Sequence, residues 1–394
     1  MARVIGAEHI IDASDRGRLN FEVFPGDIVT ALAQDTAARL GIKLLEGPEL
    51  KPEPIKTDGN TSLRRILYKR SPKWVAPRRK QSSKAKRFGK LALVGAGGVG
   101  FNIAHLSANS SLAEEISLID ITPGVAAGIA LDLNHTSGIT GSITKVSGGE
   151  SLDGISGADV VVVTAGRPRM PGMKRSDLID VNKRVIHSVA EAVRVQAQNS
   201  IVIVVTNPLD EMTLEMLRAT GFPRERVIGM AGTLDSCRFR FSLASAAGVS
   251  PSDVTGITLG SHGDEMAPIT SLARIKGQVL EKFLSKNQIE DCIKDAVTGG
   301  GQVVEIKKTG SAVLAPAHAT LELLNHIRGA LSGPVPASVM LSGEFGLKDV
   351  VLGVPIHLNR QGLVNVEEIK LSQNEHNLLM TAAGAIRSRL GLEK

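Results

Sequence analysis

Leu91-Ala-Leu-Val94-Gly95-Ala-Gly97-Gly-Val-Gly100 is the stretch that decides the fold. Four aliphatic residues run into three glycines with the spacing G-x-G-x-x-G, and a helical pattern over 99–108 follows. A strand, such a loop and a helix are typical of a dinucleotide-binding βαβ unit, because small residues let the backbone approach a pyrophosphate at the helix N-terminus. We therefore expect this loop to bind the phosphates of a cofactor through Gly95, Ala96, Gly97, Gly98, Val99 and Gly100.

Further short aliphatic runs, separated by helix-length segments, follow this loop along the chain. The predicted strands are 116–119, 160–163 and 201–205, and the predicted helices are 124–135 and 177–198. Alternating strands and helices of this kind predict an α/β fold with a Rossmann-type doubly wound parallel sheet. After residue 223 the pattern becomes mixed, which predicts an α+β catalytic domain. We predict three parts: an extension and basic linker (1–88), an NAD-binding domain (89–233) and a catalytic, substrate-binding domain (234–394).

Asp120 ends the strand that follows the glycine loop, twenty residues after Gly100. A carboxylate at this place accepts hydrogen bonds from ribose hydroxyls and repels a 2′-phosphate, so NAD is favoured over NADP. The alternative interpretation is an ordinary strand-to-helix turn followed by a surface aspartate. The combination of strand, loop, helix and acid favours the cofactor site.

Four more segments carry charge or imidazole where an α/β enzyme binds its ligands. Two of them, 164–175 and Thr206-Asn-Pro208, follow predicted strands at the carboxyl edge of the sheet. In Leu234-Asp235-Ser-Cys-Arg238 a spacing of three places the acid and the arginine on one helix face. The last, Gly260-Ser-His262-Gly-Asp-Glu265, follows another predicted strand. Together they predict a catalytic site at that edge.

With these motifs on view, residues 90 to 392 resemble the lactate and malate dehydrogenase superfamily, most closely its lactate-dehydrogenase-like malate dehydrogenases. The motifs agree in order and spacing over roughly three quarters of the chain. The resemblance implies that His262 is the general acid/base and that Asp235 orients and charges its imidazole. It implies that Arg238 binds the substrate carboxylate and that Arg175 polarises the reacting carbonyl.

The same resemblance implies the remaining contacts. Asn207 is expected to bind the reacting oxygen of the substrate, and the cofactor, NAD, is expected to contact Asn182, Val205, Thr206 and Asn207 besides the glycine loop. No metal is expected. Relatives in this family assemble, so a homodimer or homotetramer is expected by analogy.

Arg169 is the residue expected to select the substrate. A second carboxylate, as in malate or oxaloacetate, needs a buried cation, whereas an arginine facing the methyl group of lactate would remain unpaired. The resemblance therefore implies reversible NAD-dependent oxidation of (S)-malate to oxaloacetate. The alternative is an L-lactate or related 2-hydroxy-acid dehydrogenase that recycles NADH. If the loop register slipped, Arg167 would take the substrate contact instead.

The net charge of +6 is unevenly distributed. Residues 1–90 hold 19 Lys and Arg against 10 Asp and Glu, a net +9, and the remaining residues have a net charge of −3. Helical spacing over 28–40 predicts one short amphipathic helix, and 71–89 is basic, carries prolines and is typical of a disordered linker.

The two cysteines, Cys237 and Cys292, make no disulfide framework, and no segment is long and apolar enough for a membrane helix. We expect a cytoplasmic protein.

Residues 1–88 leave three interpretations open. The stretch 23–45 resembles segments that attach cargo enzymes to bacterial microcompartment shells, so the extension would dock to another protein or to a shell. The basic run 64–90 could instead bind nucleic acid, although its three aromatic residues are scattered. The third interpretation, a solvated linker, is preferred for that run, and no nucleic-acid partner is expected.

Overall fold

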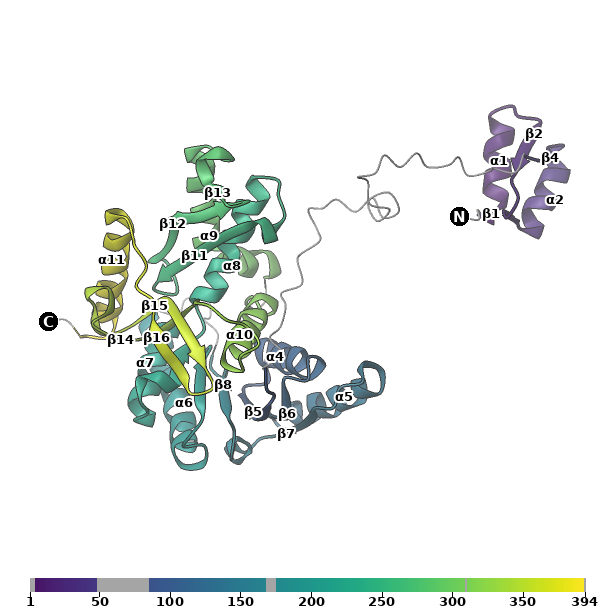
Figure 1. The fold of residues 1–394 in the computed structure, drawn as a ribbon. Helices are drawn as coiled ribbons and strands as arrows, with labels where there is room; N and C mark the ends of the chain where they lie inside the picture. The colour runs from purple at the N-terminus through teal and green to yellow at the C-terminus, as the bar shows by residue number, and fades with distance from the viewer. Residues whose placement is uncertain (1–3, 48–84, 168–174, 309, 393–394) are drawn as a thin grey trace. The chain divides into compact units, whose positions relative to one another are not determined.

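The computed structural model describes residues 4–47, 85–167, 175–308 and 310–392. These residues form two compact units, one within residues 1–70 and one within residues 71–394 (Figure 1). The predicted linker over 71–89 lies largely outside the described residues.

The smaller unit consists of two copies of a strand–helix–strand motif. The first copy contains β1 (Val4–Ile5), α1 (Ala7–Asp15) and β2 (Asn20–Val23), and the second contains β3 (Ile28–Val29), α2 (Ala31–Leu40) and β4 (Lys43–Glu46). Equivalent strands pair in parallel, β1 with β3 and β2 with β4. The helix predicted over 28–40 is present as α2, capped by the Thr30 hydroxyl and ended by Gly41 in the left-handed conformation. The folded motif around it was not predicted.

The larger unit begins with alternating strands and helices and continues with a mixed region. The first part contains β5 (Phe88–Val94), α4 (Gly98–Asn109), β6 (Ala113–Ile119), α5 (Val125–Thr140), β7 (Lys145–Gly149), β8 (Val160–Val163), α6 (Arg175–Gln196), β9 (Ile201–Val204), α7 (Leu209–Thr220) and β10 (Val227–Gly229). The second part contains α8 (Gly232–Ala246), β11 (Val254–Gly260), β12 (Met266–Ile275), β13 (Gln278–Val279), α9 (Lys286–Lys307), α10 (Leu314–Ile327), β14 (Val335–Ser342), β15 (Lys348–Asn359), β16 (Gly362–Val366) and α11 (Gln373–Arg389). Short 3-10 helices lie at Leu152–Ile155, Arg224–Arg226, Pro251–Asp253, Leu280–Lys282 and Glu344–Gly346.

Six parallel strands form the first half of the sheet in the order β7-β6-β5-β8-β9-β10. Strand order reverses between β5 and β8, which is the point where doubly wound sheets open a crevice for a ligand. The predicted Rossmann-type sheet is therefore confirmed. The second half adds antiparallel strands, and β10 pairs with β14, so one sheet of 12 strands runs through both halves. The predicted boundary near residue 233 stays a prediction.

The unbroken aliphatic run over 91–94, the second half of β5, follows from burial on both faces of the sheet. Leu91 and Leu93 pack toward α4 and α5, whereas Ala92 and Val94 pack toward α6 and α7. These four side chains are at most 4% exposed. Because successive strand residues point to opposite faces, every position must be apolar when helices cover both. Among the described helices, none has the length and apolar character needed to cross a membrane.

Candidate active site

The glycine loop forms a tight turn between β5 and α4 with one open side. Gly95 has a φ of +106°, and a Cβ there would lie 2.7 Å from the backbone nitrogen of Ala165. A Cβ on Gly100 would lie only 1.8 Å from the carbonyl oxygen of Gly95, so α4 could not begin so close to the loop. Gly97 is different, because a Cβ there would meet no protein atom within 4 Å. This open backbone at the start of a helix fits the pyrophosphate of a dinucleotide.

Asp120 stands beside this loop at the end of β6. Its Oδ2 accepts from the Ala96 N–H at 2.8 Å, and its Oδ1 accepts from the Thr122 N–H at 2.9 Å. Burial alone would raise the pKa of Asp120, but the N–H groups of Thr122 and Ala96 hold that pKa below its ordinary value. The side chain is therefore a carboxylate at neutral pH, next to the place where the adenosine ribose of NAD would lie.

Two loops at the carboxyl ends of β8 and β9 are tied together by Asn182 of α6. Its Oδ1 accepts from the Arg167 N–H at 2.7 Å, and its Nδ2 donates to the Asn207 carbonyl at 2.6 Å and the Arg167 carbonyl at 3.1 Å. The Asn182 side chain is fully buried. Its hydrogen bonds go to the backbone, so in this structure it braces the two loops. The prediction that it also contacts the cofactor stays a prediction.

Val205, Thr206 and Asn207 follow β9 directly. Thr206 is buried and donates its hydroxyl proton to the Ala165 carbonyl at 2.6 Å, which joins the ends of β8 and β9. Val205 is also buried, whereas Asn207 is exposed. Thus Asn207 is the member of this segment whose side chain is available to a ligand.

His262, Asp235 and Arg238 are brought together as the sequence predicted. His262 lies after β11, and its Nδ1 is 2.8 Å from Asp235 Oδ2. Arg238, one turn further along α8, donates from Nη1 to Asp235 Oδ1 at 3.2 Å. Burial would lower the pKa of His262, but the charge and hydrogen bond of Asp235 outweigh it, and the pKa is raised. With Nδ1 held by Asp235, Nε2 is the nitrogen that remains for a substrate.

Asp210 contacts His262, and the sequence analysis did not single it out. Its Oδ2 accepts from the His262 N–H at 2.7 Å, and its Oδ1 accepts from the Ser338 hydroxyl at 2.7 Å. The side chain is 1% exposed, and burial with the nearby charge of Glu211 raises its pKa to about 6. Asp210 therefore fixes the backbone of the histidine and adds a second carboxylate near the ring.

Arg389 of α11 was also missed, although it holds the same loop. It donates to Glu211 at 2.6 Å, to Glu265 at 3.0 Å and to the Ser261 hydroxyl at 3.1 Å. Ser261 directly precedes His262. The last turn of the C-terminal helix is thereby joined to the loop of His262 by ion pairs, in which Glu211 is 1% exposed and Arg389 17% exposed. The three partners of Arg389 lie 124 to 178 residues away in sequence, so no local pattern predicts these contacts.

The two remaining substrate arginines cannot be placed in the same way. Arg169 lies outside the described residues, and Arg175 begins α6, where the structure describes the backbone alone. The choice between Arg169 and Arg167 for the substrate contact therefore stays open.

Arg238 borders a cavity of about 670 Å³ between α8 and α9. Gly299 packs closely there, because a Cβ on it would lie 3.3 Å from Arg238 Cδ.

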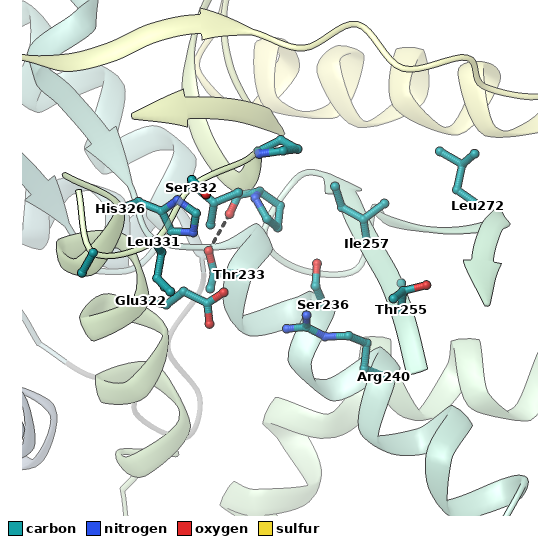
Figure 2. Close-up of a pocket in the computed structure, with 15 residues that line it drawn as sticks. Thr233, Ser236, Arg240, Thr255, Ile257, Leu272, Glu322, His326, Leu331 and Ser332 are labelled. Carbon is teal, nitrogen blue, oxygen red and sulfur yellow. Dashed lines mark hydrogen bonds between the residues drawn. The ribbon is translucent and has the colours of Figure 1, made fainter. Parts of the chain in front are cut away.

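A second cavity, of about 650 Å³, lies on the opposite face of α8 (Figure 2). Thr233, Ser236 and Arg240 reach it from α8, and Glu322 and His326 reach it from α10. The dashed line in Figure 2 is the 2.6 Å hydrogen bond from the Thr233 hydroxyl to the Pro336 carbonyl. The pair His262–Asp235 does not line this cavity, so α8 separates it from the catalytic side chains.

The chain matches two families of known domains in succession. Residues 89–229 match the lactate/malate dehydrogenase NAD binding domain, and residues 232–392 match the lactate/malate dehydrogenase alpha/beta C-terminal domain. Malate dehydrogenase 1 of Anaeromyxobacter dehalogenans is 39% identical over 307 residues, which are 77% of this chain and 98% of that one. Its similarity leaves the N-terminal unit unmatched.

Solved structures agree with this similarity. The malate dehydrogenase of Cryptosporidium parvum has 38% identity and a TM-score of 0.75, covering 78% of this chain and 98% of that chain. The lactate dehydrogenase of the same organism, solved with lactic acid and β-nicotinamide adenine dinucleotide, has 35% identity, the same TM-score and the same coverage. The fold is therefore shared by enzymes of both names.

Proposed function

The chain belongs to the lactate/malate dehydrogenase family, and from that membership we propose that it is an NAD-dependent malate dehydrogenase. It catalyses the reversible oxidation of (S)-malate to oxaloacetate. The observation that carries the proposal is the hydrogen-bonded series His262–Asp235–Arg238, which combines a base, its orienting carboxylate and a carboxylate-binding cation. NAD, when bound, supplies the hydride acceptor.

The residues of this chain account for the proton and for substrate orientation. Asp235 accepts a hydrogen bond from the Nδ1–H of His262, so the proton of the neutral imidazole stays on Nδ1 and Nε2 is unprotonated. Nε2 then takes the proton of the malate hydroxyl. In the reverse direction the charged imidazole returns this proton. Arg238 binds the carboxylate next to the reacting carbon, and Asn207 and Arg175 bind the oxygen on which charge changes. The glycine loop, with Asn182, Val205 and Thr206 nearby, positions the cofactor.

Substrate choice is proposed to depend on Arg169, which would pair with the second carboxylate of malate. Reduction of oxaloacetate and of pyruvate with NADH is measured for the wild type and for Arg169→Gln, with Arg167→Gln as the matched variant. We expect the wild type to prefer oxaloacetate and only Arg169→Gln to lose this preference by a factor of about 10² or more. If the wild type prefers pyruvate, the enzyme is a lactate-type dehydrogenase, the alternative that the 35% identical lactate dehydrogenase supports.

The N-terminal unit is proposed to attach this enzyme to another protein in the cytoplasm, and the sequence of residues 23–45 favours a microcompartment shell. Large apolar side chains at its surface support this proposal: Val4, Leu19, Ile28 and Leu32 are 58 to 74% exposed. Fluorescent fusions of the full chain and of a chain lacking residues 1–84 test it. Punctate fluorescence of the full chain alone is expected, and diffuse fluorescence of both contradicts the proposal.

The enzyme is also proposed to form a homodimer or a homotetramer. Light scattering measures the molar mass of the assembly and so distinguishes the two.

A further inference from the structure

A cavity of about 580 Å³ lies at the amino end of β5, away from the catalytic side chains. Its walls come from the segment before β5, the end of α10 with the following turn, and the hairpin of β15 and β16. The glycine loop is at the other end of β5, and seven strand residues span about 20 Å. This cavity is therefore separate from the cofactor and substrate sites.

The lining of the cavity is cationic. Lys86, Arg328 and Arg360 contribute three positive charges, and His326 and His357 contribute imidazoles. No aspartate or glutamate is among the residues described as lining it. Glu367, the carboxylate next to this wall, already contacts His357 Nε2 at 2.7 Å. A wall of this composition attracts an anion.

Arg328 is the residue that carries the argument, because it is 7% exposed and has no carboxylate partner within the described part of the chain. Its Nε donates to Asn325 Oδ1 at 2.8 Å, which fixes the plane of the guanidinium. Burial lowers the pKa of Arg328, and no neighbouring charge opposes this effect. A buried cation without a partner is costly, and an anion in the cavity would remove that cost.

Hydrogen bonds to main-chain carbonyls link the segments that carry the three cations. The Lys86 N–H donates to the Arg328 carbonyl at 3.4 Å, and Arg360 donates from Nη1 to the Lys86 carbonyl at 3.3 Å. Arg360 also lies over the ring of Phe88, 5.4 Å from its centre. These contacts bring the backbone of Lys86 next to the Arg328 carbonyl and fix the guanidinium of Arg360 against the same segment. Arg328 is buried in the cavity wall, and Lys86 and Arg360 are exposed beside it.

We infer that this cavity binds a small, phosphate-bearing anion at a site distinct from the active site. Guanidinium groups match the geometry of phosphate oxygens, and a lysine adds a point charge. The volume lies within the range of small-molecule sites, about 300–1,000 Å³, and leaves room for more than one phosphoryl group. Leu331, Leu358 and Val364 supply an apolar wall for the remainder of such a molecule.

Inorganic pyrophosphate is the probe for this site. Calorimetric titration is performed on the full chain saturated with NADH, so that the glycine loop is occupied, at constant ionic strength set with chloride. Citrate is titrated in parallel as a multivalent carboxylate. We expect saturable pyrophosphate binding with one site per chain and weaker binding of citrate. The absence of saturable pyrophosphate binding, or tighter binding of citrate, overturns the inference.

Variants locate the binding. Lys86→Ala removes an exposed side chain but keeps the backbone bonds of residue 86, and Arg328→Gln removes the buried charge. Each should weaken pyrophosphate binding by about ten-fold or more, which corresponds to about 1.4 kcal/mol. Lys348→Ala, at the opposite end of β15, is the matched control and should bind as the wild type does. If Arg328→Gln fails to fold, the pyrophosphate affinity of Lys86→Ala alone tests the assignment of the cavity. An affinity equal to that of the wild type overturns the assignment.

Discussion

His262 contacts two carboxylates, and each acts on a different part of the residue. Asp235 binds the ring nitrogen Nδ1, whereas Asp210 binds the backbone N–H. The first sets the tautomer and the charge of the imidazole, and the second sets the position of the loop. Both raise the pKa of His262 against the opposing effect of burial.

Asp235→Asn is expected to change both the rate and its pH dependence. Malate oxidation needs neutral His262, so kcat/KM rises as pH passes upward through the histidine pKa, whereas oxaloacetate reduction falls there. Removing the carboxylate lowers that pKa, so both midpoints move to lower pH, and the rate falls by about 10²–10⁴-fold. Steady-state profiles in both directions measure this. Glu191→Gln, an exposed acid of α6, should keep the wild-type midpoints, and unmoved midpoints in Asp235→Asn would contradict the assignment.

Asp210 should make the stability of the enzyme depend on pH. Its pKa is raised from 3.8 to about 6, so the folded state binds the proton more tightly than the unfolded state does. The resulting stabilisation is present at low pH and is lost as pH rises through about 6. From about pH 5 to about pH 8 the wild type should lose about 1 kcal/mol relative to Asp210→Asn, which cannot ionise there. Urea unfolding of both proteins at each pH measures the difference, and parallel curves would refute the role.

Sequence patterns predicted the residues within motifs but not their distant partners. His262, Asp235 and Arg238 were found because the latter two share one helix turn and all three stand in segments that resemble a known family. Asp210 and Arg389 stand in ordinary helical sequence, and their partners are 52 and 178 residues away. Local spacing holds no information about contacts of that range.

The turn between β5 and α4 uses its glycines for two different reasons. Gly100 leaves room for the backbone of Gly95, whereas Gly97 leaves room for a ligand. Gly100→Ala should therefore lower both stability and NADH affinity, because its Cβ collides with a carbonyl oxygen. Gly97→Ala should lower NADH affinity alone, by about ten-fold or more. NADH fluorescence titration and urea unfolding separate the two effects, and a loss of stability in Gly97→Ala would count against this division.

Helix α11 carries two half-buried arginines in its last turn, one of them in ion pairs and the other bonded to a carbonyl, which allows a matched comparison. Arg389→Met leaves Glu211, which is 1% exposed, without its cation, and should destabilise the protein by about 3 kcal/mol. Arg387 donates only to the Lys348 carbonyl, so Arg387→Met should cost about 1 kcal/mol or less. Unfolding free energies measure both costs. Equal costs would show that the ion pair contributes nothing beyond helix packing.

At the level of elements, strands buried on both faces were the easiest to predict. β8, β9 and residues 91–94 of β5 are continuous aliphatic runs because helices cover them on both sides. The helix α7 was missed, and its burial does not follow its polarity, because Asp210, Glu211 and Glu215 are buried and contact partners outside the helix. In the N-terminal unit, strands of two to four residues are too short to show any periodicity.

The two units of the molecule differ in what they contribute to the proposed reaction. The family match covers residues 89–229 and 232–392, and the side chains proposed to act in catalysis all lie there. A chain lacking residues 1–84 should therefore fold and keep its kcat/KM for oxaloacetate within about two-fold, because compact units of this size fold on their own. Steady-state assays and thermal unfolding of both chains measure this. A large loss of activity would assign the N-terminal unit a part in catalysis.

The sheet of 12 strands passes without interruption from the cofactor half into the substrate half, through the pairing of β10 with β14. A sheet shared by both halves opposes a swing of one half against the other, so we expect substrate to enter through movements of surface loops. It also means that the larger unit should melt as one body, with amides of β9, β10 and β14 exchanging through openings of the same free energy. The two halves of this enzyme would then be lost together when either is destabilised.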